Sequence, residues 1–158
     1  RQSYKVRVRT RLGDRQGISI VVDALPCTVG ADPDRLEQVL GNLLDNAAKY
    51  SPDGGEIRLT LRPDDGGALL IIRDDGIGLP AGAETTIFEP FGRAHNATAE
   101  SYPGLGLGLS ICRGIVERHG GRIWVESAGE GAGTTVHVWL PCTVGSPRDD
   151  AATLSSAA

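Results

Sequence analysis

The sequence predicts an α/β domain of two layers, in which helices cover one face of a mixed, mostly antiparallel sheet. Its 158 residues, 40% of them apolar and 23% charged, are typical of one globular domain. Several segments have the composition and periodicity of strands, and turns rich in Gly, Pro and Asp join them in pairs, which is typical of hairpins. Helical segments interrupt these strands, but not in the strand–helix alternation of a doubly wound fold.

The N-terminal third is predicted to contain two strands and a long helix. Residues 4–12 alternate between apolar and polar side chains, and residues 18–22 form a second strand-like run. Asp32 and Pro33 predict the start of a helix, because Asp is a favoured N-cap and Pro is tolerated at the first helical position. A core-facing stripe runs along this helix and comprises Leu36, Val39, Leu40, Leu43, Leu44 and Ala47.

Two hairpins and a second helix are predicted in the rest of the chain. The first hairpin pairs residues 57–61 with residues 69–73 through a turn at 63–67. The second hairpin pairs residues 123–126 with residues 135–140. The second helix lies between the hairpins.

That helix covers residues 107–119, and a long irregular stretch from 76 to about 104 precedes it. Loops of more than about 12 to 15 residues in a compact domain are usually functional. We expect residues 1–17 to form a linker or an extra edge strand, residues 18–141 the folded domain, and residues 142–158 a disordered tail.

Charge and cysteine content exclude several classes of function. The net charge of -4 argues against a general nucleic-acid binder, and no apolar run reaches the ~20 residues that span a bilayer. Cys27, Cys112 and Cys142 lie far apart without a CxxC pair, which argues against a zinc site or a disulfide framework. We therefore expect reduced thiols, a cytoplasmic location and no direct membrane contact.

Glycine is the unusual component, because 22 residues of this type are about twice the average share. One cluster is Asp74-Asp75-Gly76-Ile77-Gly78, directly after a predicted strand. There a carboxylate could accept a hydrogen bond from an exocyclic amine, although Asp-Gly is also an ordinary turn. Gly104, Gly106 and Gly108 precede the second helix, where free amides favour an anion, although a flexible hinge would have the same composition.

Three polar side chains share one face of the first helix. At 100° per residue, Asn42, Asn46 and Lys49 fall within about 60° of one another and beside the apolar stripe. Asn is a mediocre helix former, so two in mid-helix lower the helix propensity. They form either a solvated polar face, or oxygen ligands for a hard cation such as Mg²⁺ with Lys49 reaching phosphate oxygens.

Together these motifs resemble the ATP-binding catalytic domain of sensor histidine kinases, in the superfamily with gyrase, mismatch-repair and heat-shock chaperone ATPases. Residues 34–52 resemble the asparagine box of the family, residues 74–78 its first glycine box and residues 87–91 its phenylalanine box. Residues 104–109 resemble the second glycine box and residues 133–135 the third. The resemblance covers about residues 18–140 and implies a Bergerat-type ATP-binding fold with about three helices on the sheet.

The resemblance implies ATP and Mg²⁺ as cofactors. Asn46 would be the principal Mg²⁺ ligand, Asn42 would support the metal or its waters, and Lys49 would contact phosphates. These three would be the catalytic residues. Tyr50 would pack near the ribose and adenine, and Asp74 would accept a hydrogen bond from the adenine amino group.

The resemblance also implies a mobile lid over residues 79–102, which Phe88 and Phe91 would anchor. Thr135 would sit on the strand that lines the pocket floor. Gly76 and Gly78 would let the base enter the pocket. The segment 104–108 would hinge the lid and wrap the triphosphate; its residues are Gly104, Leu105, Gly106, Leu107 and Gly108.

No phosphoacceptor histidine is recognisable. In the family this histidine precedes an acidic residue on a separate helical hairpin, whereas His95, His119 and His137 have other neighbours. His119 is interpreted as a residue at a helix C-terminus and His137 as a residue on a strand face. The chain is thus expected to be a monomeric catalytic fragment that phosphorylates a histidine-bearing dimerisation domain and, through it, a response regulator.

The sequence leaves two alternative functions open. One is another ATPase of the superfamily or a serine kinase of the anti-sigma type, against which the phenylalanine box and Lys49-Tyr50 argue. The other is a non-catalytic nucleotide-sensing module, against which the complete set of motif residues argues.

Overall fold

A computed structural model describes residues 3–4, 17–92, 108–142 and 151–153, to which the structural statements below refer. The sheet contains β2 (Ile18–Ala24), β4 (Gly55–Asp64), β5 (Gly67–Asp74), β6 (Arg122–Glu126), β7 (Thr134–Pro141) and the two-residue β1 (Ser3–Tyr4). The helices are α1 (Pro33–Lys49), α2 (Ala83–Thr86) and α3 (Gly108–Arg118), and two short strands, β3 (Thr28–Gly30) and β8 (Ala151–Thr153), pair separately.

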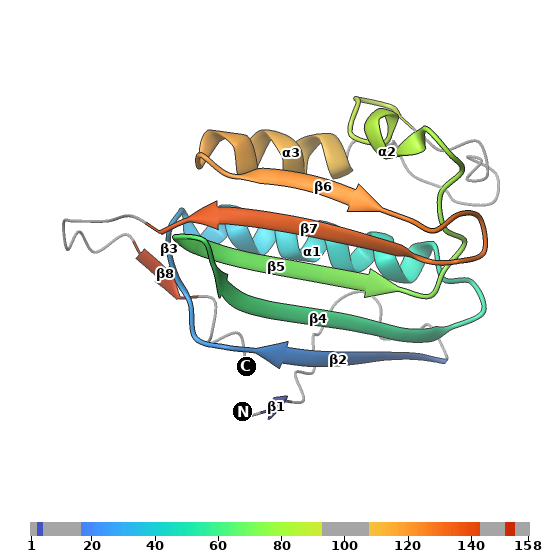
Figure 1. The fold of residues 1–158 in the computed structure, drawn as a ribbon, viewed down its shortest axis with the longest axis horizontal. Coiled ribbons are helices and arrows are strands. Elements are labelled where there is room, and N and C mark those ends of the chain that lie inside the picture. The colour runs from blue at the N-terminus through green and yellow to red at the C-terminus, as the bar shows by residue number, and fades with distance from the viewer. Residues whose placement is uncertain (1–2, 5–16, 93–107, 143–150, 154–158) are drawn as a thin grey trace.

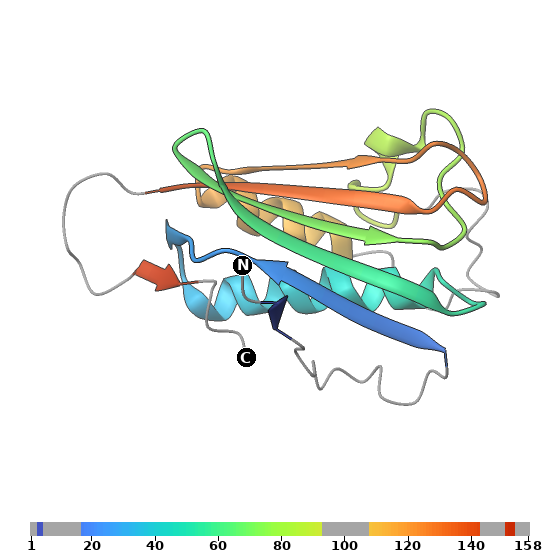
Figure 2. The same ribbon diagram turned by 60° about the horizontal axis from the view of Figure 1, so that its bottom comes forward.

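The main sheet is mixed and mostly antiparallel, as predicted. Its strands lie in the order β1-β2-β4-β5-β7-β6, and only the β2–β4 pair is parallel. Helices α1 and α3 lie against one face of this sheet (Figures 1 and 2), so the fold is a two-layer sandwich. No helix among the described residues is long and apolar enough to cross a bilayer.

Helix α1 begins and packs as its sequence predicts. The Asp32 carboxylate accepts a hydrogen bond from the Asp34 amide at 2.9 Å, and Pro33 occupies the first turn. The predicted apolar stripe is buried against the sheet and α3, except that Leu40 is only half-buried. Burying a side chain of the size of Leu contributes about 1.5–3 kcal/mol, so this stripe supplies much of the core.

The turn of the first hairpin is tighter than predicted. Asp65 and Gly66 have positive φ values of 41° and 73°, and Pro63 and Asp64 belong to β4 rather than to the turn. Two residues with positive φ match the right-handed twist of the two strands. The Trp139 Nε1 group also donates to the Asp64 carbonyl at 2.9 Å, which stabilises this end of the sheet.

The helix-free face of the sheet carries a stack of rings. The Trp124 and His137 rings are parallel, with centroids 4.9 Å apart, and the Arg122 guanidinium lies 5.4 Å from the ring centroids of both Trp124 and Trp139. Burial lowers the pKa of His137. His137 is therefore a residue of the strand face, as the sequence indicates.

The structure differs from the sequence prediction at the short strand β3 and at the N-terminal strand. Strand β3 is not predicted, and it pairs antiparallel with residues 151–153, which lie inside the expected disordered tail. Only residues 3–4 represent the predicted strand over 4–12, the rest of which lies outside the described residues. A three-residue pair is too short to produce a clear period-two pattern in the sequence.

Candidate functional site

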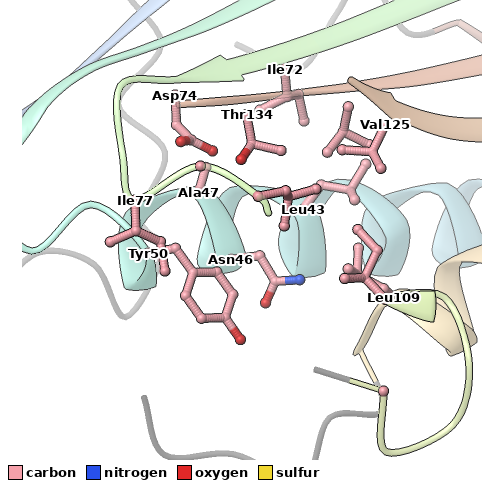
Figure 3. A pocket seen from close by; sticks show the side chains of 15 residues that line it. Leu43, Asn46, Ala47, Tyr50, Ile72, Asp74, Ile77, Leu109, Val125 and Thr134 are labelled. Carbon is pink, nitrogen blue, oxygen red and sulfur yellow. The ribbon is translucent and has the colours of Figure 1, made fainter. Parts of the chain in front are cut away.

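A cleft of about 670 Å³, part of it open to solvent, lies between α1 and the sheet. Figure 3 shows Asp74 and Thr134 on the strand side of the cleft and Asn46 and Tyr50 on the helix side. Most of the lining is apolar, which suits a flat, partly apolar ligand. The lining residues are Leu43, Asn46, Ala47, Tyr50, Ile72, Asp74, Ile77, Gly78, Leu79, Ile87, Gly92, Leu109, Val125, Thr134 and Val136.

Asp74 is the buried carboxylate of the cleft, with 7% of its surface exposed. Its Oδ1 atom accepts a hydrogen bond from the Gly76 amide at 2.9 Å, and the Thr134 backbone also donates to the carboxylate. Burial raises the pKa of Asp74 to about 6, Asp75 adds to this increase, and the two backbone donors partly offset it. The side chain is thus a hydrogen-bond acceptor at the end of an apolar slot.

The glycines after Asp74 allow close packing of backbone against backbone. A β-carbon at Gly76 would collide with the Tyr50 carbonyl oxygen, and one at Gly78, where φ is +66°, with the Gly129 carbonyl oxygen. The Ile77 amide donates to the Tyr50 carbonyl at 2.9 Å, so this loop is held against the end of α1. Gly78 lines the cleft. Gly76 does not line it, but its lack of a side chain lets the loop approach the end of α1.

Of the polar residues predicted on α1, the structure places Asn46 and Tyr50 in the cleft. Asn46 also faces the start of α3, since a β-carbon at Gly108 would lie 4.0 Å from its Nδ2 atom. The Lys49 Nζ atom lies 5.1 Å from the centroid of the Tyr50 ring, outside the cleft lining.

Asn42 does not line the cleft. Its side chain hydrogen-bonds to the buried Cys112 thiol of α3, whose pKa burial raises to about 11. The thiol is therefore neutral, and it faces the Val39 carbonyl oxygen at 3.8 Å. Asn42 is directed towards α3, one helical turn before Asn46.

Two predicted positions lie elsewhere than expected. Thr135 does not line the cleft, because side chains alternate along a strand and its neighbours Thr134 and Val136 face inward instead. Phe91 is 69% exposed and has a positive φ of 59°, so it does not contact the cleft. Phe88, by contrast, is buried in a small cluster with Leu79, Ala83, Ile87 and Val125.

Other predicted positions lie outside the described residues, namely Gly104, Leu105, Gly106 and Leu107. The apolar walls of the cleft, such as Ile72, Val125 and Val136, were not among the predicted site residues. The alternation of the predicted strands does place these residues on the inward face, but it does not distinguish a cleft wall from any other part of the core.

The donor set restricts which metal the cleft could hold. Among the described residues, no three His, Cys, Asp or Glu side chains form a group that could bind a metal ion. The amide oxygen of Asn46 is a hard ligand of the kind that Mg²⁺ accepts, but Mg²⁺ is usually held by one or two protein ligands together with phosphate oxygens. The site therefore fits a metal that arrives with a phosphate ligand.

Residues 31–144 match the family described as "Histidine kinase-, DNA gyrase B-, and HSP90-like ATPase". The chain belongs to this family. The match includes all residues of the described cleft, so the predicted fold and the resemblance of the motifs are confirmed.

The similar proteins are sensor kinases. The chain is 41% identical to the sensor histidine kinase WalK of Bacillus subtilis over 72% of the chain and 19% of WalK. It is 43% identical to the adaptive-response sensory kinase SasA of Synechococcus elongatus over 84% of the chain and 34% of SasA. The chain thus spans about a fifth to a third of the length of these curated relatives.

Among solved structures, the mycobacterial sensor histidine kinase MprB is 40% identical, with a TM-score of 0.72 over 78% of this chain and 83% of that chain. The catalytic domain of the histidine kinase ThkA is 31% identical, with a TM-score of 0.68 over 80% and 82% of the two chains. This chain is accordingly an ATPase domain of the sensor histidine kinase type.

Proposed function

We propose that this domain binds ATP with Mg²⁺ and donates the γ-phosphoryl group to a histidine on a separate dimerisation domain, which then phosphorylates a response regulator. The observation that carries the proposal is the cleft itself, in which a buried carboxylate and a helix amide project from opposite walls. The sequence similarity to the kinases SasA and WalK over most of this chain supports a function in a histidine kinase.

The base of ATP would occupy the end of the cleft at Asp74. The Gly76 and Thr134 amides orient the carboxylate, so a free lone pair can accept from an exocyclic amino group. Apolar side chains of the sheet, such as Ile72 and Val136, and of α1, such as Ala47, would contact the two faces of a planar base. Each group in this end of the cleft therefore serves recognition rather than chemistry.

The phosphates would lie towards Asn46 and the start of α3. The Asn46 amide would hold Mg²⁺, which would neutralise charge on the phosphates during transfer. Helix α3 begins at Gly108, and the N-terminus of a helix favours an anion beside it. Lys49 would have to leave the Tyr50 ring to reach a phosphate, which a flexible lysine side chain can do.

We propose a cytoplasmic location for the domain, because ATP and response regulators are found there. The histidine-bearing domain would approach the open mouth of the cleft, where the γ-phosphate would lie. Catalysis would then consist mostly of positioning and charge neutralisation.

The direct test is a titration with ATP, with and without Mg²⁺, on the wild type and on Asp74→Ala. We expect wild type to bind ATP and Asp74→Ala to bind it at least tenfold more weakly, since a lost hydrogen bond to a charged group removes about 1.5–3 kcal/mol. Wild type that shows no affinity for ATP at millimolar concentration would contradict the proposal.

A second experiment tests phosphoryl transfer. Mixed with the histidine-bearing hairpin of a sensor kinase parent and labelled ATP, the domain should phosphorylate the hairpin, and Asn46→Ala should abolish the labelling. Acid-labile phosphate is expected on histidine; acid-stable phosphoserine on a partner would indicate the anti-sigma type instead. Continued labelling with Asn46→Ala would contradict the proposal that Asn46 holds the metal ion. Binding of ATP without transfer to the hairpin would favour a nucleotide-sensing module.

A further inference from the structure

Helices α1 and α3 lie side by side and antiparallel, with contacts at three levels. The start of α3 at Gly108 lies beside Asn46, near the C-terminal end of α1. In the middle, the Cys112 thiol meets Val39 and Asn42. At the far end, His119 follows the last residue of α3 and contacts Asp32, the N-cap of α1. The alignment of the two helices thus sets which residue of α1 faces the start of α3.

His119 makes a specific polar connection between the two helix ends. Its Nδ1 atom lies 2.7 Å from the Ile115 carbonyl oxygen in the last turn of α3, and its Nε2 atom lies 3.2 Å from the Asp32 backbone nitrogen. The Asp32 carboxylate already caps α1 through the Asp34 amide. One imidazole therefore joins the carbonyl end of α3 to the capped beginning of α1.

The Ile115 carbonyl and the Asp32 backbone N–H determine which nitrogen of the His119 ring carries the proton. A carbonyl oxygen can only accept, so Nδ1 must carry a proton, and a backbone N–H can only donate, so Nε2 must be unprotonated. The two hydrogen bonds together select the tautomer with the proton on Nδ1. His119 therefore lies at the C-terminal end of α3, as interpreted from the sequence, and it also contacts Asp32, which the sequence does not predict.

We propose that His119 is a positioning residue for phosphate binding, because it holds α3 in the register that places the first turn of α3 beside Asn46. The inference rests on the proposed function. The residues Val39, Ile115 and Val116 of the two helices are packed in one core cluster, so the three-turn helix α3 moves as a rigid unit and an anchor at one end affects the position of the other end.

The position of His119 predicts which part of the nucleotide binds more weakly when the His119 connection is lost. The base end of the cleft is built from β5, β7 and the loop after Asp74, whereas the His119 ring hydrogen-bonds to residues at the ends of α1 and α3. The phosphate end depends on the alignment of α3 with Asn46. Loss of the connection should therefore weaken binding of the phosphates and leave recognition of the base unchanged.

The test compares the affinities of His119→Leu and His119→Gln for Mg²⁺-ATP and for adenosine. Leu removes both hydrogen bonds at similar volume, whereas the Gln side-chain oxygen can still accept from the Asp32 amide. We expect His119→Leu to bind Mg²⁺-ATP roughly fivefold more weakly, as for the loss of about 1 kcal/mol, with adenosine affinity unchanged. His119→Gln should recover most of the Mg²⁺-ATP affinity.

Several outcomes would overturn the positioning role. These are equal losses for Mg²⁺-ATP and adenosine, no loss for either, or a Gln variant no better than Leu. If wild type binds neither ligand, the proposed function fails and the positioning role with it; if wild type binds Mg²⁺-ATP, the variants decide the positioning role alone.

A measurement on wild type covers the case in which His119→Leu does not fold. Nitrogen-15 NMR of the imidazole should show a protonated Nδ1 and an unprotonated Nε2 for His119 at neutral pH, and the same state with Mg²⁺-ATP bound. A proton on Nε2, or a change of tautomer on binding, would show that the connection to Asp32 is absent in the state that binds nucleotide and would overturn the inference.

Discussion

Asp74 keeps a titratable carboxyl group in a place where burial disfavours its charge. It is 7% exposed, and two backbone amides donate to it without fully offsetting the loss of solvation. A residue serving only the fold could be replaced there by an amide or an apolar side chain. Its position in the cleft supports the proposed role of the carboxylate as an acceptor for a ligand.

The raised pKa of Asp74 predicts a pH dependence of stability. The folded protein holds the proton more tightly than the unfolded chain, so this contribution is complete below pH 3.8 and is lost as pH rises through about 6. The loss amounts to about 3 kcal/mol. Urea unfolding of wild type and Asp74→Ala from pH 3.5 to 7 should show a wild-type stability that falls relative to the variant; parallel curves would contradict it.

Gly78 is predicted to be intolerant of a side chain. Its φ is +66°, and a β-carbon would collide with the Gly129 carbonyl oxygen. Gly78→Ala should lose roughly 2–4 kcal/mol of unfolding free energy, from backbone strain and overpacking together. Gly66→Ala is the matched control, because Gly66 has a similar φ of +73° and open space around it. Equal losses in the two variants would show that the collision is unimportant.

At the scale of elements, the segment from Leu79 to Gly92 is held by a small cluster separate from the main core. Phe88 is 6% exposed within it, while Phe91, three residues later, is 69% exposed. The two phenylalanines of one motif thus have different roles in the described structure. Phe88 fastens the α2 segment to β6, and Phe91 presents its ring to the outside.

This difference gives a prediction for the α2 segment. Phe88→Ala should open a cavity of the kind that costs about 3–5 kcal/mol in a core, and the loss should fall mainly on this segment. Hydrogen exchange of the Ile87 amide, which bonds to the Ala83 carbonyl, should accelerate in Phe88→Ala and stay unchanged in Phe91→Ala. Equal exchange rates in both variants would contradict the assignment of Phe88 as the anchor.

For the whole molecule, the cleft draws residues from both helices of the core layer and from three strands. A ligand there should stabilise the complete domain, by about 2.7 kcal/mol at a concentration one hundred times its Kd. Thermal unfolding should therefore shift upward with Mg²⁺-ATP.

GTP is the control for base recognition. Guanine presents a carbonyl oxygen where adenine presents its amino group, so it would place an acceptor against the Asp74 carboxylate. GTP at the same concentration should give little or no shift of the unfolding temperature. A shift equal to that of ATP would exclude Asp74 as the group that reads the base.

The sequence by itself determined most of the elements and several residues of the cleft. Alternation and helical spacing predicted the two hairpins and both long helices, and local rules placed the N-cap at Asp32. The motifs contained Asn46, Tyr50 and Asp74, three of the polar residues that line the cleft, because residue type and spacing along one element are local properties.

Only the tertiary structure decided how the elements meet. The inward residue of β7 is Thr134 rather than Thr135, since the sheet register and not the motif sets the face. Asn42 turned out to face Cys112, and His119 to join two helix ends 87 positions apart in the chain. Such contacts depend on packing between distant segments, and no periodicity within either segment contains that information.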